Sequence, residues 1–296
     1  MINYNFSGNS GFDPVRNLGI EACDYSGLSF YIGVGAPESS KEDPHYKVRL
    51  NLETPNFLYC DTFENETTYD LSLHLCPYTC NYLNAKHGVT KFKPTFFPIK
   101  WYERPAVERG IPVFYTGSAI HSLSVYNTIE RELVHRLGPR YGELKCRIAS
   151  PSAEGYIAKL NLLSETKIAL IHNILSGVSA IPNFSFFATD PLCIQHLPWH
   201  TKDSELLPQL KSRTFEAAMM GCVLLVYKDK YRTIERYFTE NEHFVYYEND
   251  LSEKIDHILS HYDEYKPMAE RAKQKVKDCY TTEHFIQYVR TLKDTA

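Results

Sequence analysis

The chain has 296 residues, enough for two domains of modest and unequal size, and its 43% hydrophobic and 23% charged residues are typical of a globular protein. A formal net charge of −4 removes any general attraction to nucleic acid or to an anionic membrane, so a phosphate-binding site has to be local. No run approaches 18 apolar residues, and the first residues lack a basic and then apolar leader. We therefore expect a cytoplasmic protein that does not bind nucleic acid and has no integral membrane segment.

The first hundred residues predict short strands separated by turns. The expected strands cover 2–6, 28–33, 57–61 and 71–75. A helix is expected over 14–23, because Pro14 suits the first turn of a helix. The stretch 92–103, with two prolines and many aromatic residues, is expected to cross between two domains.

From about residue 105 onward, strands and helices alternate. The expected strands cover 111–115, 144–149, 167–172, 223–227 and 244–247. The expected helices cover 122–137, 154–163, 209–220 and 251–262, and two more begin at Pro267 and at Thr281 or Thr282. A long loop with three prolines precedes the helix 209–220, and Gly221 is placed to end that helix.

Such alternation is typical of a parallel sheet with helices on both faces. The predicted fold class is α/β with two Rossmann-like domains, of which the N-terminal one is small. We divide the chain into an N-terminal domain (1–100), a C-terminal domain (101–280) and a last helix (281–296) that packs back on the N-terminal domain. Sheets of this kind bind ligands beyond the carboxyl ends of their strands.

The segment from Lys211 to Val226 is the most informative part of the chain. Lys211 and Arg213 lie at the predicted start of a helix near Thr214, where free N–H groups and the helix dipole favour a diphosphate. Glu216, about one turn into the helix, has a carboxylate that can accept two hydrogen bonds from a ribose diol, in an open cleft. The alternative is that both cations are solvated and that Glu216 only complements the helix dipole.

From Lys211 to about Val289 the chain resembles the C-terminal domain of group-1 glycosyltransferases, particularly their spore-maturation-protein-like branch. The matching features are Arg213-Thr214-Phe215-Glu216, a glycine before an apolar strand, Ile234-Glu235, the Tyr-rich strand 244–247 and Tyr280-Thr281. Further upstream, the segment 113–118 is similar to the first strand and glycine turn of the same domain.

The resemblance implies a GT-B fold and transfer of a hexosyl or pentosyl group from a nucleotide sugar to a glycan or other hydroxyl acceptor. It makes 1–100 the acceptor-side domain and 101–280 the nucleotide-sugar-binding domain. It assigns Glu216 to the ribose, and Lys211, Arg213 and the helix start at Thr214 to the diphosphate. Gly117 and Ser118 would let the backbone approach the donor. We expect no cofactor and no metal, because the cations and the helix end supply the positive charge for the departing diphosphate.

The stereochemistry of transfer stays open. Many retaining members of the family have a second glutamate eight positions before the ribose-binding one, but residue 208 is a proline. An inverting enzyme needs a general base for the acceptor hydroxyl. The candidates are Asp13, His74 and Glu53, each close to a predicted strand end or turn in the N-terminal half, where a purely structural role is equally open.

Other motifs are incomplete. Cys76 and Cys80 form one C-x3-C pair, whereas a structural zinc site needs four ligands, so no metal site is expected. Gly33 and Gly35 lack the third glycine of a dinucleotide-binding turn, and the sequence contains no Asp-x-Asp. Two other functions remain: a sugar-nucleotide epimerase of similar fold, and a non-catalytic nucleotide-sugar-binding protein.

Overall fold

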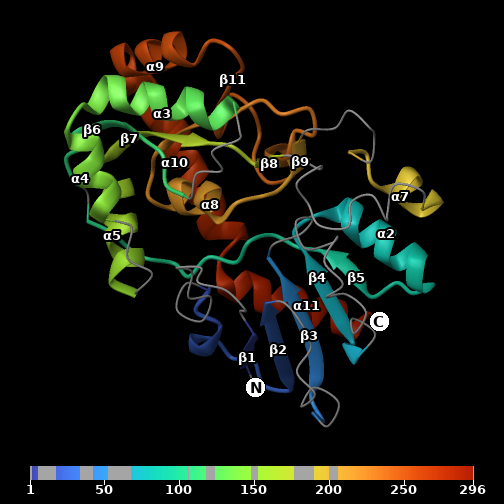
Figure 1. Ribbon diagram of the computed structural model, residues 1–296. Helices are drawn as coiled ribbons and strands as arrows, with labels where there is room; N and C mark the ends of the chain where they lie inside the picture. Colours follow the sequence, from blue (N-terminus) through green and yellow to red (C-terminus); the bar gives the residue numbers. More distant parts are fainter. Residues whose placement is uncertain are drawn as a thin grey trace.

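The computed structural model shows two α/β halves, each built on its own parallel sheet (Figure 1). It describes residues 2–5, 18–33, 43–52, 68–105, 107–117, 124–147, 153–176, 190–199 and 206–295. The strand predicted over 57–61 lies outside these ranges. Of the helix predicted over 14–23, the described part contains a short 3-10 helix, η1 (Ile20–Ala22).

The N-terminal sheet has five parallel strands in the order β1-β2-β3-β4-β5. The strands are β1 (Ile2–Asn5), β2 (Leu28–Gly33), β3 (Tyr46–Asn51), β4 (Leu71–His74) and β5 (Phe92–Pro94). Side chains alternate between the two faces of a strand. Phe30 and Val48 therefore lie on an apolar face, whereas Arg49 and His74 belong to a face of buried polar side chains.

The sequence did not predict β3, β5 or the helix α2 (Pro77–His87). The buried residues of α2 lie at helical spacing, but Thr79 among them is polar and Tyr82 carries a hydroxyl, so the sequence shows no clear apolar stripe. Its ends do have recognisable residues: Pro77 occupies the first helical position, and Gly88 ends the helix with φ 64°.

The C-terminal sheet has four parallel strands in the order β11-β10-β7-β6. They are β6 (Ile111–Phe114), β7 (Thr166–Ile171), β10 (Val223–Tyr227) and β11 (Phe244–Tyr247). Along β10, Leu224 packs into one hydrophobic cluster and Val223 into another, so this strand is buried on both faces. Such burial explains its continuous apolar sequence. The predicted α/β class with parallel sheets is thus confirmed.

Helices cover both faces of this sheet. They are α3 (Ser124–Leu137), α4 (Arg140–Arg147), α5 (Ala153–Ser164), α8 (Ser212–Met219), α9 (Leu251–Ser260) and α10 (Tyr262–Cys279), together with the 3-10 helix η7 (Thr233–Arg236). Helix α8 ends as predicted: Gly221 has φ 72°, and Cys222 N donates to Ala217 O.

Three local expectations were wrong. Of the strand predicted over 144–149, the described residues 144–147 are the end of helix α4, in which Leu144 is buried and Cys146 exposed, unlike two residues on one face of a strand. Pro267 lies inside α10, which begins at Tyr262; near the helix start a proline removes only one intrahelical hydrogen bond. The predicted long loop contains α7 (Pro191–His196) and β9 (Leu206–Pro208), which pairs antiparallel with β8 (Ile174–Ser176).

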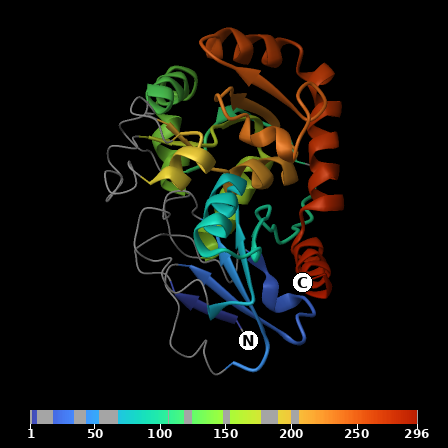
Figure 2. The same cartoon turned by 90° about the vertical axis from the view of Figure 1, so that its right-hand side faces the viewer.

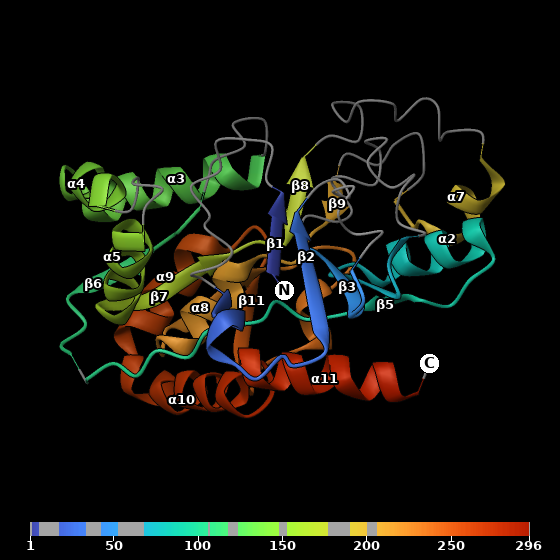
Figure 3. The same cartoon turned by 90° about the horizontal axis from the view of Figure 1, so that it is seen from below.

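The chain passes between the two halves at two neighbouring segments. Ile99 N donates to Tyr280 O at 3.1 Å, and Thr282 N donates to Ile99 O at 3.0 Å, so the two crossings lie side by side. Figures 2 and 3 show α10 running beside the C-terminal sheet and α11 (Thr282–Asp294) continuing along the N-terminal sheet. There Phe285 contacts Phe30, with ring centroids 5.9 Å apart.

Candidate functional site

The carboxyl ends of β6 and β7 meet the start of helix α8. Strands β6 and β7 are neighbours in the sheet, so Tyr115, which directly follows β6, lies beside His172, which directly follows β7. Helix α8 begins at Ser212, and the backbone N–H of Lys211 donates to Asn173 Oδ1 at 2.9 Å. This is the edge of a parallel sheet at which ligands bind.

Gly117 and Arg213, both predicted as donor-binding residues, lie in direct contact. Gly117 has φ 146°, a conformation that favours glycine, and a Cβ at this position would overlap the Arg213 guanidinium. A glycine is therefore required here to let the guanidinium lie against the backbone. Ser118, the neighbouring predicted residue, lies outside the described residues.

The Tyr115 side chain contacts both a guanidinium and an imidazole. Arg213 Cζ is 4.6 Å from the ring centroid, and its Nη1 donates a hydrogen bond to the Tyr115 hydroxyl. The His172 ring stacks on the Tyr115 ring, with ring centroids 5.2 Å apart and an interplanar angle of 18°. Its Nε2 lies 3.2 Å from the Tyr115 hydroxyl. Burial, assisted by the charge of Lys211, lowers the pKa of His172 to about 3, so the imidazole is neutral near pH 7.

Asn173 holds the start of helix α8 against the end of β7. Its Oδ1 accepts hydrogen bonds from Lys211 N at 2.9 Å and from Thr214 Oγ1 at 3.0 Å. Thr214 is fully buried. The Thr214 hydroxyl is therefore a structural contact to Asn173, and the assignment of the helix start at Thr214 to the diphosphate remains a prediction.

Glu216 does not lie in an open cleft, contrary to the expectation from the sequence. It is 1% exposed, and its carboxylate forms an ion pair with Lys159 Nζ of α5 at 2.8 Å. Burial and the nearby Glu216 charge raise the pKa of Tyr156 on the same helix. In this structure Glu216 thus joins α8 to α5, and its binding of a ribose remains a prediction.

His74 is a poor candidate for the catalytic base. It is fully buried at the end of β4, its Nε2 lies 3.0 Å from Ser72 Oγ, and burial with the charge of Arg49 lowers its pKa to about 3. An acceptor hydroxyl has no access to such a group, and its affinity for a proton is low. The other two candidates, Asp13 and Glu53, lie outside the described residues.

Pro208, which occupies the position of the second glutamate of retaining relatives, is a buried residue of β9 and pairs with Ile174 of β8. Among the described residues, no group of three or more His, Cys, Asp or Glu is arranged to hold a metal ion. Within the same residues, no helix has the length and apolar character needed to cross a membrane.

The sequence did not identify Tyr115, His172 and Asn173 as site residues. They have one property in common that was visible: each is a polar or aromatic residue within two positions of the end of an apolar strand of the C-terminal sheet. In a parallel sheet such positions gather at one edge. Polar residues at strand ends are common, however, and only the strand order shows that β6 and β7 are neighbours.

The family described as "Glycosyl transferase-like" matches residues 128–291, more than half of the chain. The protein therefore belongs to this glycosyl transferase-like family. A search of curated proteins found no match.

Three solved structures resemble the chain. Sucrose-phosphate synthase from Thermosynechococcus elongatus shares 12% identity, with a TM-score of 0.48 over 94% of this chain and 76% of that one. TarM shares 12% identity, with a TM-score of 0.52 over 91% of this chain and 56% of TarM. A mutant of S. aureus TarM, in complex with fondaparinux, alpha-GlcNAc-glycerol and UDP, shares 10% identity, with a TM-score of 0.50 over 92% of this chain and 56% of that one.

At these identities the likeness shows the fold alone. The predicted fold of two Rossmann-like domains of the GT-B type is confirmed, with the N-terminal domain the smaller one. The chain spans 56% of the length of TarM.

Proposed function

We propose that this protein transfers a hexosyl or pentosyl group from a nucleotide sugar to a glycan or another hydroxyl acceptor. The observation that carries the proposal is the meeting of Gly117 and Arg213 beside the start of α8, at the carboxyl edge of the C-terminal sheet. Residues far apart in the sequence thereby come together, and with Lys211 they would form one electropositive surface. Family membership and the GT-B fold support the same function.

The chemistry required of this surface is stabilisation of negative charge. When the bond between sugar and diphosphate breaks, charge grows on the departing nucleoside diphosphate. Lys211, Arg213 and the N–H groups at the start of α8 would bind that charge. The proposal therefore includes transfer without a divalent metal and without a cofactor.

UDP-sugars are the first donors to test, because the S. aureus TarM mutant was solved with UDP and an α-GlcNAc compound. GDP- and dTDP-sugars are the next. A thermal-shift screen finds the nucleotide first, since a ligand at 100 times its dissociation constant stabilises a protein by about 2.7 kcal/mol.

Turnover distinguishes the three functions that the sequence left open. Each donor that binds is incubated with and without a panel of hydroxyl acceptors, and the nucleotide and sugar products are analysed. Acceptor-dependent release of nucleoside diphosphate supports transfer. An isomerised donor without release would show an epimerase, and binding without turnover would show a non-catalytic protein.

Arg213→Ala tests the place of the site in the same assay. It should reduce acceptor-dependent release. A matched control is Arg271→Ala, which removes an exposed arginine of α10 that donates only to the Glu242 carbonyl among the described contacts. Equal activity of the two variants would place the donor elsewhere.

For the acceptor side we propose Asp13 or Glu53 as the general base if transfer inverts the sugar. Replacement of the base by its amide, Asp13→Asn or Glu53→Gln, should abolish transfer and leave nucleotide affinity unchanged. Membership of the spore-maturation-protein-like branch and a cytoplasmic location belong to this proposal as well.

A further inference from the structure

The His172 imidazole has one nitrogen in use and one without a partner. Nε2 lies 3.2 Å from the Tyr115 hydroxyl, whereas Nδ1 is buried and has no hydrogen-bond partner among the residues that the structure describes. The side chain is almost fully buried, with 4% of the residue exposed. A buried donor without an acceptor destabilises a fold, so such a group requires an explanation.

The hydrogen bonds around Tyr115 determine which nitrogen of His172 holds the proton. An arginine can only donate, so the Tyr115 oxygen accepts from Arg213 Nη1, and the Tyr115 O–H remains to donate. Its neighbour is His172 Nε2, which must then be the acceptor. Because the imidazole is neutral, its single proton resides on Nδ1, and the unpartnered nitrogen is therefore an N–H donor.

A second unpartnered donor lies next to it in the chain. Asn173 is buried and uses Oδ1 for Lys211 N and Thr214 Oγ1, while its Nδ2 has no partner among the described residues. Both donors follow β7, next to the start of α8, and Lys211 is close enough for its charge to act on His172. A ligand with several negatively charged oxygens would satisfy this group of donors and cations together.

We propose that His172 is a donor-binding residue whose Nδ1–H hydrogen-bonds a phosphate oxygen of the nucleotide. Tyr115 is its positioning residue, because the Tyr115 hydroxyl fixes the imidazole through Nε2 and also accepts a hydrogen bond from Arg213. This inference rests on the proposed binding of a nucleotide sugar. It adds a neutral hydrogen-bond donor, at the end of β7, to the two cations already proposed to bind the diphosphate.

Two substitutions of His172 separate this role from a purely structural one. In His172→Asn the side-chain amide N–H can take the place of Nδ1–H, but the shorter side chain has no atom that can reach the Tyr115 hydroxyl and accept its hydrogen bond. In His172→Gln the longer side chain can take the place of Nε2 toward Tyr115, and the Nδ1 donor is lost. Both variants lose the ring equally, so the stacking on Tyr115 does not distinguish them.

The experiment is isothermal titration of each variant with UDP, GDP and dTDP and with the corresponding nucleosides. We expect His172→Gln to weaken diphosphate binding about 10- to 100-fold, the range for a lost hydrogen bond to a charged group, and His172→Asn to retain most of the affinity. Nucleoside binding should be the same in both. His243→Gln is the matched control, since His243 is also buried but its Nδ1 accepts from Thr239 N, away from this edge.

Three results would overturn the inference. If His172→Asn loses as much affinity as His172→Gln, or more, the contact to Tyr115 is what matters. If nucleosides lose affinity equally, the ligand atom is not a phosphate oxygen. If the unmodified protein binds nucleotide diphosphates but neither variant changes their affinity, only this inference fails, whereas absence of any nucleotide binding would refute the proposed function with it.

Discussion

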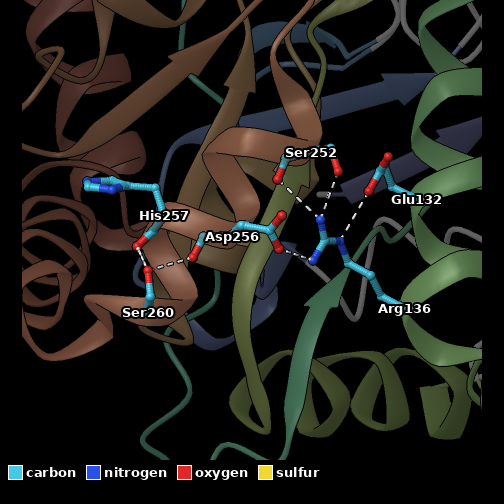
Figure 4. Close-up of polar contacts among 6 residues, drawn as sticks. All are labelled: Glu132, Arg136, Ser252, Asp256, His257 and Ser260. Carbon is cyan, nitrogen blue, oxygen red and sulfur yellow. Dashed lines mark hydrogen bonds and ion pairs between the residues drawn. The ribbon is translucent and has the colours of Figure 1, made fainter.

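Helix α3 contacts two polar regions, one near each end. The two regions differ in how many of their polar groups have hydrogen-bond partners within the protein. In its last turn, Arg136 donates to Glu132 Oε2 at 3.1 Å, to Asp256 Oδ1 at 2.7 Å and to the carbonyl and hydroxyl of Ser252 at 3.2 and 3.1 Å (Figure 4). All three guanidinium nitrogens have a protein partner. This contact joins α3 to α9 on one face of the C-terminal sheet.

Near its first turn, α3 supports the candidate site. Tyr126 packs edge-on against Tyr115, with ring centroids 5.8 Å apart. Beyond Tyr115 lie Arg213 and His172, and here donors remain without acceptors among the described residues, as His172 Nδ1 shows. Unsatisfied buried donors cost stability.

The comparison separates structural from ligand-binding polar groups. A polar contact that only joins two helices can be completed by the protein itself, as around Arg136. A binding site has to leave donors open for the ligand, and it is held in place by neighbours such as Tyr126 that have no need to touch the ligand. The following predictions test this difference, from the largest expected effect to the smallest.

Lys159→Met should destabilise the fold most. It leaves the Glu216 carboxylate, which is 1% exposed, without its ion partner, and breaking a buried pair in this way typically costs about 3–5 kcal/mol. Urea unfolding measures the loss. The control is Lys145→Met, whose pair with Glu130 is longer, at 3.5 Å, and solvent-exposed, so a loss below about 1 kcal/mol is expected. Similar losses in both variants would contradict a structural role of Glu216.

Joint replacement of Lys211 and Arg213 by alanine should slow transfer more than it weakens binding. Charge on the diphosphate grows as the sugar leaves, so these cations act mainly on the transition state. Removing one such electrostatic donor costs about 10²–10³ in rate. Steady-state kinetics and titration with the nucleoside diphosphate provide the two numbers. A loss confined to KM would show that the cations bind donor and transition state equally.

Arg136→Met should reduce the free energy of unfolding by about 1–3 kcal/mol, because it leaves the Glu132 side chain, 11% exposed, without its hydrogen-bond donor. Transfer activity at 25 °C should not change. Asp256→Asn, on the exposed side of the same contact, should cost less than about 1 kcal/mol, since the Asp256 side chain is 69% exposed. Lost activity in a folded Arg136→Met protein would connect this region to the site.

Removal of divalent metal should have no effect. In excess EDTA the transfer rate is expected to equal the untreated rate, because cations and a helix start are proposed to supply the charge at the diphosphate. The rate is measured before and after addition of Mn²⁺ or Mg²⁺. Activity that appears only with one of these ions would refute metal-independent transfer.

The sequence alone was sufficient to predict the helices and strands whose residue pattern is typical of the element they form. Strands β2, β10 and β11 have the predicted bounds, α3 has its predicted apolar face in Ile129 and Leu133, and Gly221 ends α8. Continuous apolar runs, helical spacing and a helix-ending glycine are local properties, so they can be read without knowledge of the rest of the chain. The motif Arg213-Thr214-Phe215-Glu216 likewise indicated the family.

Local sequence was insufficient where a neighbour in space decides the outcome. Residues 144–147 form part of helix α4 and not the predicted strand, and in this helix Leu144 is the residue that is buried against the core. The ion pair of Glu216 depends on Lys159, which lies on another helix. The neutral state of His74 depends on its burial on the polar face of the N-terminal sheet.

The same reason applies to the candidate site. Tyr115, His172 and Arg213 lie in three separate segments of the sequence, and of these only Arg213 was predicted as a site residue. Only the strand order, which makes β6 and β7 neighbours and places the start of α8 at their carboxyl ends, brings the two rings and the guanidinium group into contact. Strand order arises from long-range packing of the whole sheet, and no short stretch of sequence determines it.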